Sequence, residues 1–100
     1  NLGNTLKYLF INRNRLEGSI PTTLGRLSKL STMSLSDNNL TGIIPRQFAL
    51  LTELNTFLVQ SNNLRGSISY HLLNSWKLKL RELNLSENQF SGTIPELFCD

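Results

Sequence analysis

The sequence has one cysteine, one histidine and no long apolar run. Cys99 has no second cysteine with which to form an internal disulfide, although a single cysteine says nothing about the redox compartment. His71 stands in no spacing typical of a metal site or of a catalytic triad, so we expect no metal, no cofactor and no catalytic residue. No apolar stretch approaches the roughly 18 residues that suggest a membrane span. These absences predict a non-catalytic segment without a membrane span, and they leave open a catalytic domain elsewhere in a longer protein.

Charge is also weakly patterned. The net charge is +3, and the basic residues are scattered apart from a short group between Lys77 and Arg81. No basic groove with interleaved aromatic residues is visible, so we expect no nucleic-acid partner. The chain begins with neither a basic stretch nor an apolar one. We therefore expect no secretory signal within these residues, whereas a longer parent can still carry one.

The sequence contains one motif of about 16 residues that occurs four times. The motif starts at Leu6, Leu30, Leu54 and Leu80, and its second copy is LSTMSLSDNNLTGIIP. Its asparagines recur at intervals of 24, 24 and 26 residues, at Asn14, Asn38, Asn62 and Asn88. A fixed period in this range is typical of an array of stacked structural units.

Each copy predicts one coil of that array. The opening L-x-x-L-x-L alternates buried and variable positions, as in a short strand, and four such strands should form a parallel sheet. The asparagine follows the strand, where the chain must turn. Because its amide both donates and accepts, we expect a ladder of asparagines that satisfies buried backbone groups. The glycine and the isoleucine–proline pair that follow predict a close backbone approach and then a short 3₁₀ or α turn.

The third copy departs from the other copies in two ways. The third copy has Ser69 in place of proline and carries two extra residues before Leu80, with Trp76 and Leu78 where one apolar residue is expected. We expect Trp76 to cover its coil, with a lateral docking point as the alternative. Cys99 occupies a small-residue position of the repeat, which favours a buried thiol over a disulfide to a partner.

The second copy continues as RQFALLTE and so follows LxxLxLxxNxLxGxIPxxLxxLxx almost throughout. This string resembles the plant-specific class of leucine-rich repeat, as in receptor-like kinases, receptor-like proteins and polygalacturonase-inhibiting proteins. The resemblance implies an α/β solenoid: a right-handed superhelix with short parallel strands on the concave face and helical turns on the convex side. The paired-cysteine caps of such ectodomains are missing. We expect residues 1–100 to be one segment of a longer array, with a partial repeat 1–5 and repeats 6–29, 30–53, 54–79 and 80–100.

The variable residues around the buried strand positions should face the concave surface. Our candidate ligand-binding residues are Tyr8, Phe10, Asn12, Arg13, Ser34, Ser36, Leu58, Gln60, Glu82, Asn84 and Glu87. Aromatic and basic types, favoured in binding hot spots, gather at one end, and two glutamates make the other end acidic. Candidate N-glycosylation sequons begin at Asn39, which we expect to be exposed, and at Asn84, where a glycan would obstruct the concave face.

These features favour a recognition module that binds a protein or peptide on its concave face, within an extracellular receptor-like protein. A glycan ligand is a further option, and the oligomeric state stays open. The alternatives are a secreted inhibitor of a cell-wall-degrading enzyme such as polygalacturonase, and an intracellular scaffold. Ice binding requires one flat residue type repeated down a column, and the irregular columns argue against it.

Overall fold

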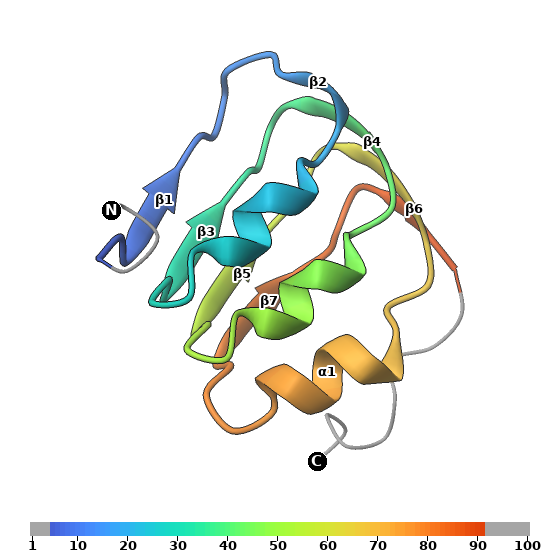
Figure 1. Ribbon diagram of the computed structural model, residues 1–100. Coiled ribbons are helices and arrows are strands. Elements are labelled where there is room, and N and C mark those ends of the chain that lie inside the picture. Colours follow the sequence, from blue (N-terminus) through green and yellow to red (C-terminus); the bar gives the residue numbers. More distant parts are fainter. Residues whose placement is uncertain (1–4, 92–100) are drawn as a thin grey trace.

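The structure is a computed structural model that describes residues 5–91, and it shows a stack of coils (Figure 1). A short strand near the start of each coil pairs in parallel with its counterpart in the next coil. This first sheet consists, in spatial order, of β1 (Tyr8–Phe10), β3 (Thr32–Ser34), β5 (Thr56–Leu58) and β7 (Glu82–Asn84). At the middle of these strands, Met33 and Phe57 are buried in the apolar core, and Leu9 and Leu83 are partly buried against it. The predicted parallel sheet and its buried positions are confirmed.

A second parallel sheet, which the repeat pattern did not predict, follows the asparagine turns. It consists, in spatial order, of β2 (Glu17–Ser19), β4 (Asn39–Gly42), β6 (Asn63–Gly66) and β8 (Gln89–Phe90). The glycines in the first three of these strands have φ of +85, +84 and +88°. Glycine adopts this left-handed region without the steric strain that a Cβ would cause. The glycine period that predicted a close backbone approach therefore also lets the coils pair a second time.

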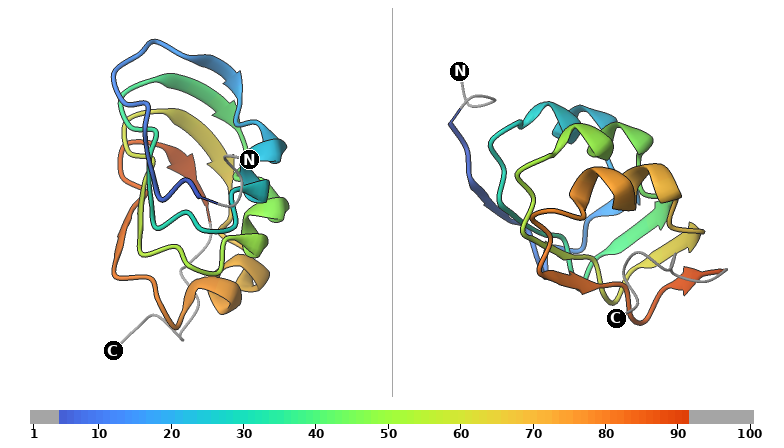
Figure 2. Two further views of the ribbon diagram at one scale, coloured as in Figure 1. Left: turned by 60° about the vertical axis from the view of Figure 1, so that its left-hand side comes forward. Right: turned by 90° about the horizontal axis from the view of Figure 1, so that it is seen from below.

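Short helical turns cover the convex side, and they stack on one side of the coils in both views of Figure 2. The first two are 3₁₀ turns, η2 (Thr22–Arg26) and η3 (Arg46–Leu50), each preceded by proline. The third is an α-helix, α1 (Tyr70–Trp76), and its N-cap Ser69 accepts a hydrogen bond from the Leu72 N–H at 3.1 Å. A serine hydroxyl satisfies a free helical N–H that proline leaves unpaired. The predicted short helical turns on the convex side are confirmed, and they include both 3₁₀ and α geometry.

The insertion in the third repeat seals the core. Trp76 is fully buried, and its indole Nε1 donates a hydrogen bond to the carbonyl of Phe48 at 3.0 Å. Its ring also packs against Phe57, with centroids 5.3 Å apart. Trp76 therefore covers its coil as predicted, and it has no exposed surface for the alternative role in lateral docking.

The asparagine ladder is confirmed in the inner coils. The Asn38 Oδ1 accepts hydrogen bonds from the backbone N–H groups of Asn14 and Leu16 in the preceding coil, at 2.9 and 3.0 Å. Its Nδ2 donates to backbone carbonyls of both coils, those of Ile11 (2.9 Å), Leu35 (2.9 Å) and Ser36 (3.2 Å). Asn62 and Asn88 also bridge adjacent coils. Asn14 is exposed, and within residues 5–91 its side chain bonds only to the Asn12 carbonyl.

The small-residue position assigned to Cys99 is tightly packed where the structure describes it. A Cβ placed on Gly25 would lie 2.6 Å from the carbonyl oxygen of Gln47 in the next coil. Ala49 takes the same place one coil later, partly buried against the core. Cys99 itself lies outside the described residues, so its predicted burial stays a prediction.

Candidate functional site

The concave face is made by the outward columns of the first sheet. Tyr8 aligns with Thr32, Thr56 and Glu82, while Phe10 aligns with Ser34, Leu58 and Asn84. Backbone hydrogen bonds continue the pairing past the strands, because the Arg13 N–H donates to the Ser36 carbonyl and the Asp37 N–H to the Gln60 carbonyl. These alignments place all of the predicted concave residues in neighbouring columns.

One end of this face is aromatic and basic. Tyr8 and Phe10 are 60% and 64% exposed, so β1 presents two large rings to solvent. Arg13 follows β1 in the left-handed backbone conformation, with a φ of 59°. Its Nε lies 3.8 Å from the Asp37 Oδ2, and because both side chains are exposed this pair adds little stability. The structure thus brings the predicted aromatic and basic residues together on one coil.

The centre of the face is flatter than the sequence suggests. Ser34 and Ser36 are buried, with 4% and 5% of their surfaces exposed, and their hydroxyls lie 3.4 Å apart. Each serine sits between longer residues of the adjacent coils, and strands only about 4.8 Å apart let those neighbours cover a short side chain. Both remain in the predicted surface, but they leave little area for a ligand to contact.

Gln60 adds an unusual polar atom to the same region. Gln60 is half-buried, and its side-chain Oε1 is buried without a hydrogen-bond partner among the described residues. An unsatisfied buried acceptor costs about 1–3 kcal/mol, so a donor that reached it would recover part of that energy. Leu58, also half-buried, is the apolar residue on the same coil.

The other end of the face is acidic. Glu82 and Glu87 are exposed, and the Glu87 Oε2 accepts a hydrogen bond from the Ser61 hydroxyl at 2.6 Å. The Asn84 Oδ1 accepts from both the N–H and the hydroxyl of Ser86, at 3.1 and 2.7 Å. Acid and aromatic groups therefore lie at opposite ends of the first sheet, on β7 and β1.

The two sequons lie on different faces. Asn39 is exposed on β4 in the second sheet, as expected, so a glycan there would leave the concave face free. Asn84 is half-buried on β7 in the first sheet, where its Oδ1 is bonded to Ser86. Whether either sequon is used stays a prediction.

A basic hollow extends the concave face beyond the start of β1, and sequence reasoning missed it. The hollow has a volume of about 460 Å³, and its lining is Lys7, Tyr8, Lys29, Ser31, Glu53, Asn55 and Lys79. The Lys79 Nζ lies 3.3 Å from the Glu53 Oε1 across its edge. No local sequence pattern predicts the hollow, because Lys29 reaches it only through the convex turn that brings the chain back beside the next strand.

Neither a metal-ligand cluster nor a membrane-spanning helix occurs within residues 5–91. Residues 5–91 contain no group of three or more His, Cys, Asp or Glu side chains able to hold a metal ion. His71 is exposed on α1. Among the same residues, no helix has the length and apolar character needed to span a membrane.

The comparisons with known proteins agree with this geometry. The leucine-rich repeat family model matches residues 4–64, and a second leucine-rich repeat model matches residues 79–100. The chain belongs to the leucine-rich repeat family. Curated proteins show no match to this leucine-rich repeat chain.

Solved structures of plant proteins share the fold. A chain in the crystal structure of the BIR3–SERK2 complex from Arabidopsis thaliana is 38% identical, with a TM-score of 0.86. The matched region covers 95% of the present chain and 50% of that one. A chain in the structure of the Arabidopsis receptor kinase HAESA, in complex with the peptide hormone IDA and the co-receptor SERK1, is 39% identical with a TM-score of 0.82. The matched region covers 91% of the present chain and 15% of that one. A plant ice-binding protein is 31% identical, with a TM-score of 0.81 and coverages of 93% and 30%. The chain spans half or less of these relatives.

Proposed function

We propose that this leucine-rich repeat chain is a non-catalytic recognition module that binds a protein or peptide ligand on its concave face, in the ectodomain of an extracellular receptor-like protein. The observation that carries the proposal is the exposure of Tyr8 and Phe10 side by side on β1. Aromatic residues dominate binding hot spots because they bury a large area with few rotatable bonds. Arg13 and the basic hollow add charge beside them.

The relatives support the ligand class. HAESA is described in complexes with the peptide hormone IDA and with the co-receptor SERK1, and BIR3 in a complex with SERK2. The ice-binding relative suggests a different activity. The column Tyr8, Thr32, Thr56 and Glu82 argues against that activity here, because it lacks one flat residue type repeated across the sheet.

The test is to select a random-peptide library on the intact protein and compare variants for binding of the selected peptides. We expect Tyr8→Ala combined with Phe10→Ala to weaken binding at least about tenfold, since hot-spot truncations cost about 2 kcal/mol or more. The melting temperature should change little because both rings are exposed. The matched control is Tyr70→Ala combined with Leu50→Ala, which removes a comparable pair of exposed apolar side chains from the convex side.

Equal loss of affinity in both double variants would contradict a concave site. A large drop in melting temperature for the Tyr8 and Phe10 variant would instead show that these rings support the fold. Inhibition of a polygalacturonase by the intact protein would favour the secreted-inhibitor alternative.

A further inference from the structure

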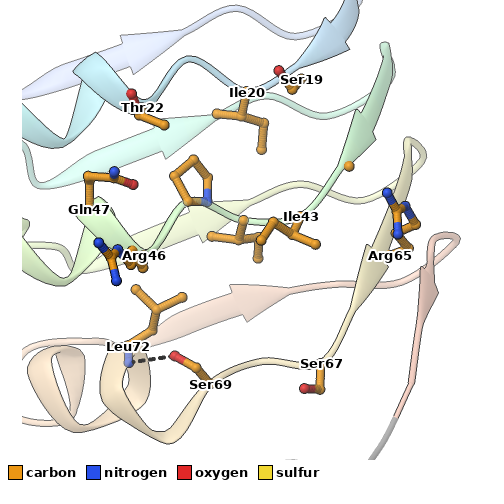
Figure 3. A pocket seen from close by; sticks show the side chains of 13 residues that line it. Ser19, Ile20, Thr22, Ile43, Arg46, Gln47, Arg65, Ser67, Ser69 and Leu72 are labelled. Carbon is orange, nitrogen blue, oxygen red and sulfur yellow. Dashed lines mark hydrogen bonds between the residues drawn. The ribbon is translucent and has the colours of Figure 1, made fainter.

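A groove lies between the second sheet and the helical turns, away from the concave face (Figure 3). We call it the lateral groove. It has a volume of about 810 Å³, and its lining residues come from three successive coils. That volume falls within the roughly 300–1,000 Å³ typical of ligand sites. The groove is therefore large enough for a short peptide segment.

The centre of the lateral groove is apolar. Ile43 is 57% exposed there, although large aliphatic side chains are usually buried. A Cβ on Gly66 would lie 3.0 Å from the Ile43 Cγ2, so this side chain rests directly on the bare backbone of β6. Below it, Ile20, Ile44 and Leu72 belong to the buried core and make the floor. Ile43 is thus held in place as an exposed apolar contact.

The two ends of the lateral groove are positively charged. Arg46 and Arg65 lie on opposite sides of the apolar centre in Figure 3, and both are exposed. No Asp or Glu is among the lining residues, and within residues 5–91 neither arginine takes part in an ion pair. Arginine presents a planar fork of donors that matches a carboxylate. The groove therefore has two free cationic ends that complement anionic groups.

We propose that the lateral groove binds an extended acidic peptide segment, with an apolar side chain against Ile43 and a carboxylate on each of Arg46 and Arg65. A peptide fits better than an acidic polysaccharide, because the lining is aliphatic and contains no aromatic ring on which a sugar could stack. The exposed hydroxyls of Ser19, Thr22 and Ser67 are available to the peptide backbone. This site is independent of the concave face, which binds through Tyr8 and Phe10.

The experiment measures binding of fluorescein-labelled, end-capped peptides to the intact protein by fluorescence anisotropy. The probe is Glu-Ala-Leu-Ala-Glu, and the matched peptides are Gln-Ala-Leu-Ala-Gln and Glu-Ala-Ser-Ala-Glu. We expect the probe to bind more tightly than either matched peptide. Arg46→Gln and Arg65→Gln should each raise its Kd about threefold, as for exposed ion pairs, and the double variant about tenfold. Ile43→Ser should raise the Kd about fivefold through lost apolar burial.

The control Arg26→Gln removes an equal charge from η2 outside the groove and should leave the Kd unchanged. An equal effect of Arg26→Gln and Arg46→Gln would overturn the proposal, since it would indicate non-specific charge attraction. Equal binding of the acidic and neutral peptides would also overturn it. So would a result in which oligogalacturonate binds and depends on the two arginines while the probe peptide does not bind. If Phe10→Ala abolished probe binding and Arg46→Gln did not change the Kd, the peptide would bind the concave face instead. That result would overturn the groove proposal without contradicting the proposed function.

Discussion

At the residue scale, Asn38 donates and accepts hydrogen bonds in two coils at once. Its amide reaches backbone groups of residues 11, 14 and 16 in one coil and residues 35 and 36 in its own. Since Asn38 is buried, water cannot replace those bonds when the side chain is removed. Asn14 occupies the same place in the repeat but is exposed, so the two positions separate the effect of the sequence pattern from that of the surroundings.

We expect Asn38→Ala to lower the free energy of unfolding by about 1–3 kcal/mol, because it leaves several buried backbone groups unpaired. Asn14→Ala should cost no more than about 0.5 kcal/mol, as for other exposed substitutions. Urea denaturation followed by circular dichroism measures both. Similar losses at the two positions would show that the ladder does not depend on burial.

At the element scale, the third helical turn differs from the first two because of its capping residue and its length. Pro21 and Pro45 precede η2 and η3 without a side-chain cap, whereas the Ser69 hydroxyl caps α1. The two extra residues extend this turn to Trp76, whose indole then reaches the Phe48 carbonyl. The cap and the insertion together account for an α-helix at a position where the other described coils have 3₁₀ turns.

We expect Ser69→Ala to lower the free energy of unfolding by about 1 kcal/mol, the usual cost of losing a serine cap. Ser69→Pro should cost less than Ser69→Ala, because the native φ of −73° already suits the proline ring and the unfolded chain becomes less flexible. Equilibrium urea unfolding compares the two variants. A larger loss for proline than for alanine would mean that the backbone at residue 69 does not accommodate a proline ring.

At the scale of the whole molecule, the spacing between coils is set where backbones meet. Gly25 faces the carbonyl of Gln47 in the next coil so closely that a methyl group does not fit. Ala49 occupies the equivalent position one coil further on, partly buried against the core, and Leu73 occupies it in the coil after that, fully buried. Among the coils that the structure describes, this position therefore requires glycine only at Gly25.

Gly25→Ala should destabilise the protein by about 1–3 kcal/mol, the range for overpacking a well-packed site. Ala49→Gly, the converse change in the next coil, should cost only about 1 kcal/mol through the loss of one buried methyl group. Thermal unfolding by calorimetry tests the pair. Equal and small effects would show that the coils can shift apart without loss of packing.

Much of the candidate site could be predicted from the sequence, because a strand of known register assigns each residue to a face. The columns containing Tyr8 and Phe10 lie where the repeat places them. The burial of Ser34 and Ser36 could not be predicted, because it depends on the length of their neighbours in adjacent coils. The lateral groove was missed for the same reason, since Ile43, Arg46 and Arg65 come from two different coils.

The sequence by itself determined the period, the parallel strands, the asparagine ladder and the family, because each rests on a local constraint repeated in every coil. Only the tertiary structure decided the second sheet, the choice between coil cover and lateral docking for Trp76, the unsatisfied Oε1 of Gln60 and the lateral groove. Those features arise between coils, where backbone hydrogen bonds and packing join residues more than 20 positions apart. The physical reason is that a repeat specifies its own coil, whereas contacts between coils depend on pairs of residues that differ from one coil to the next.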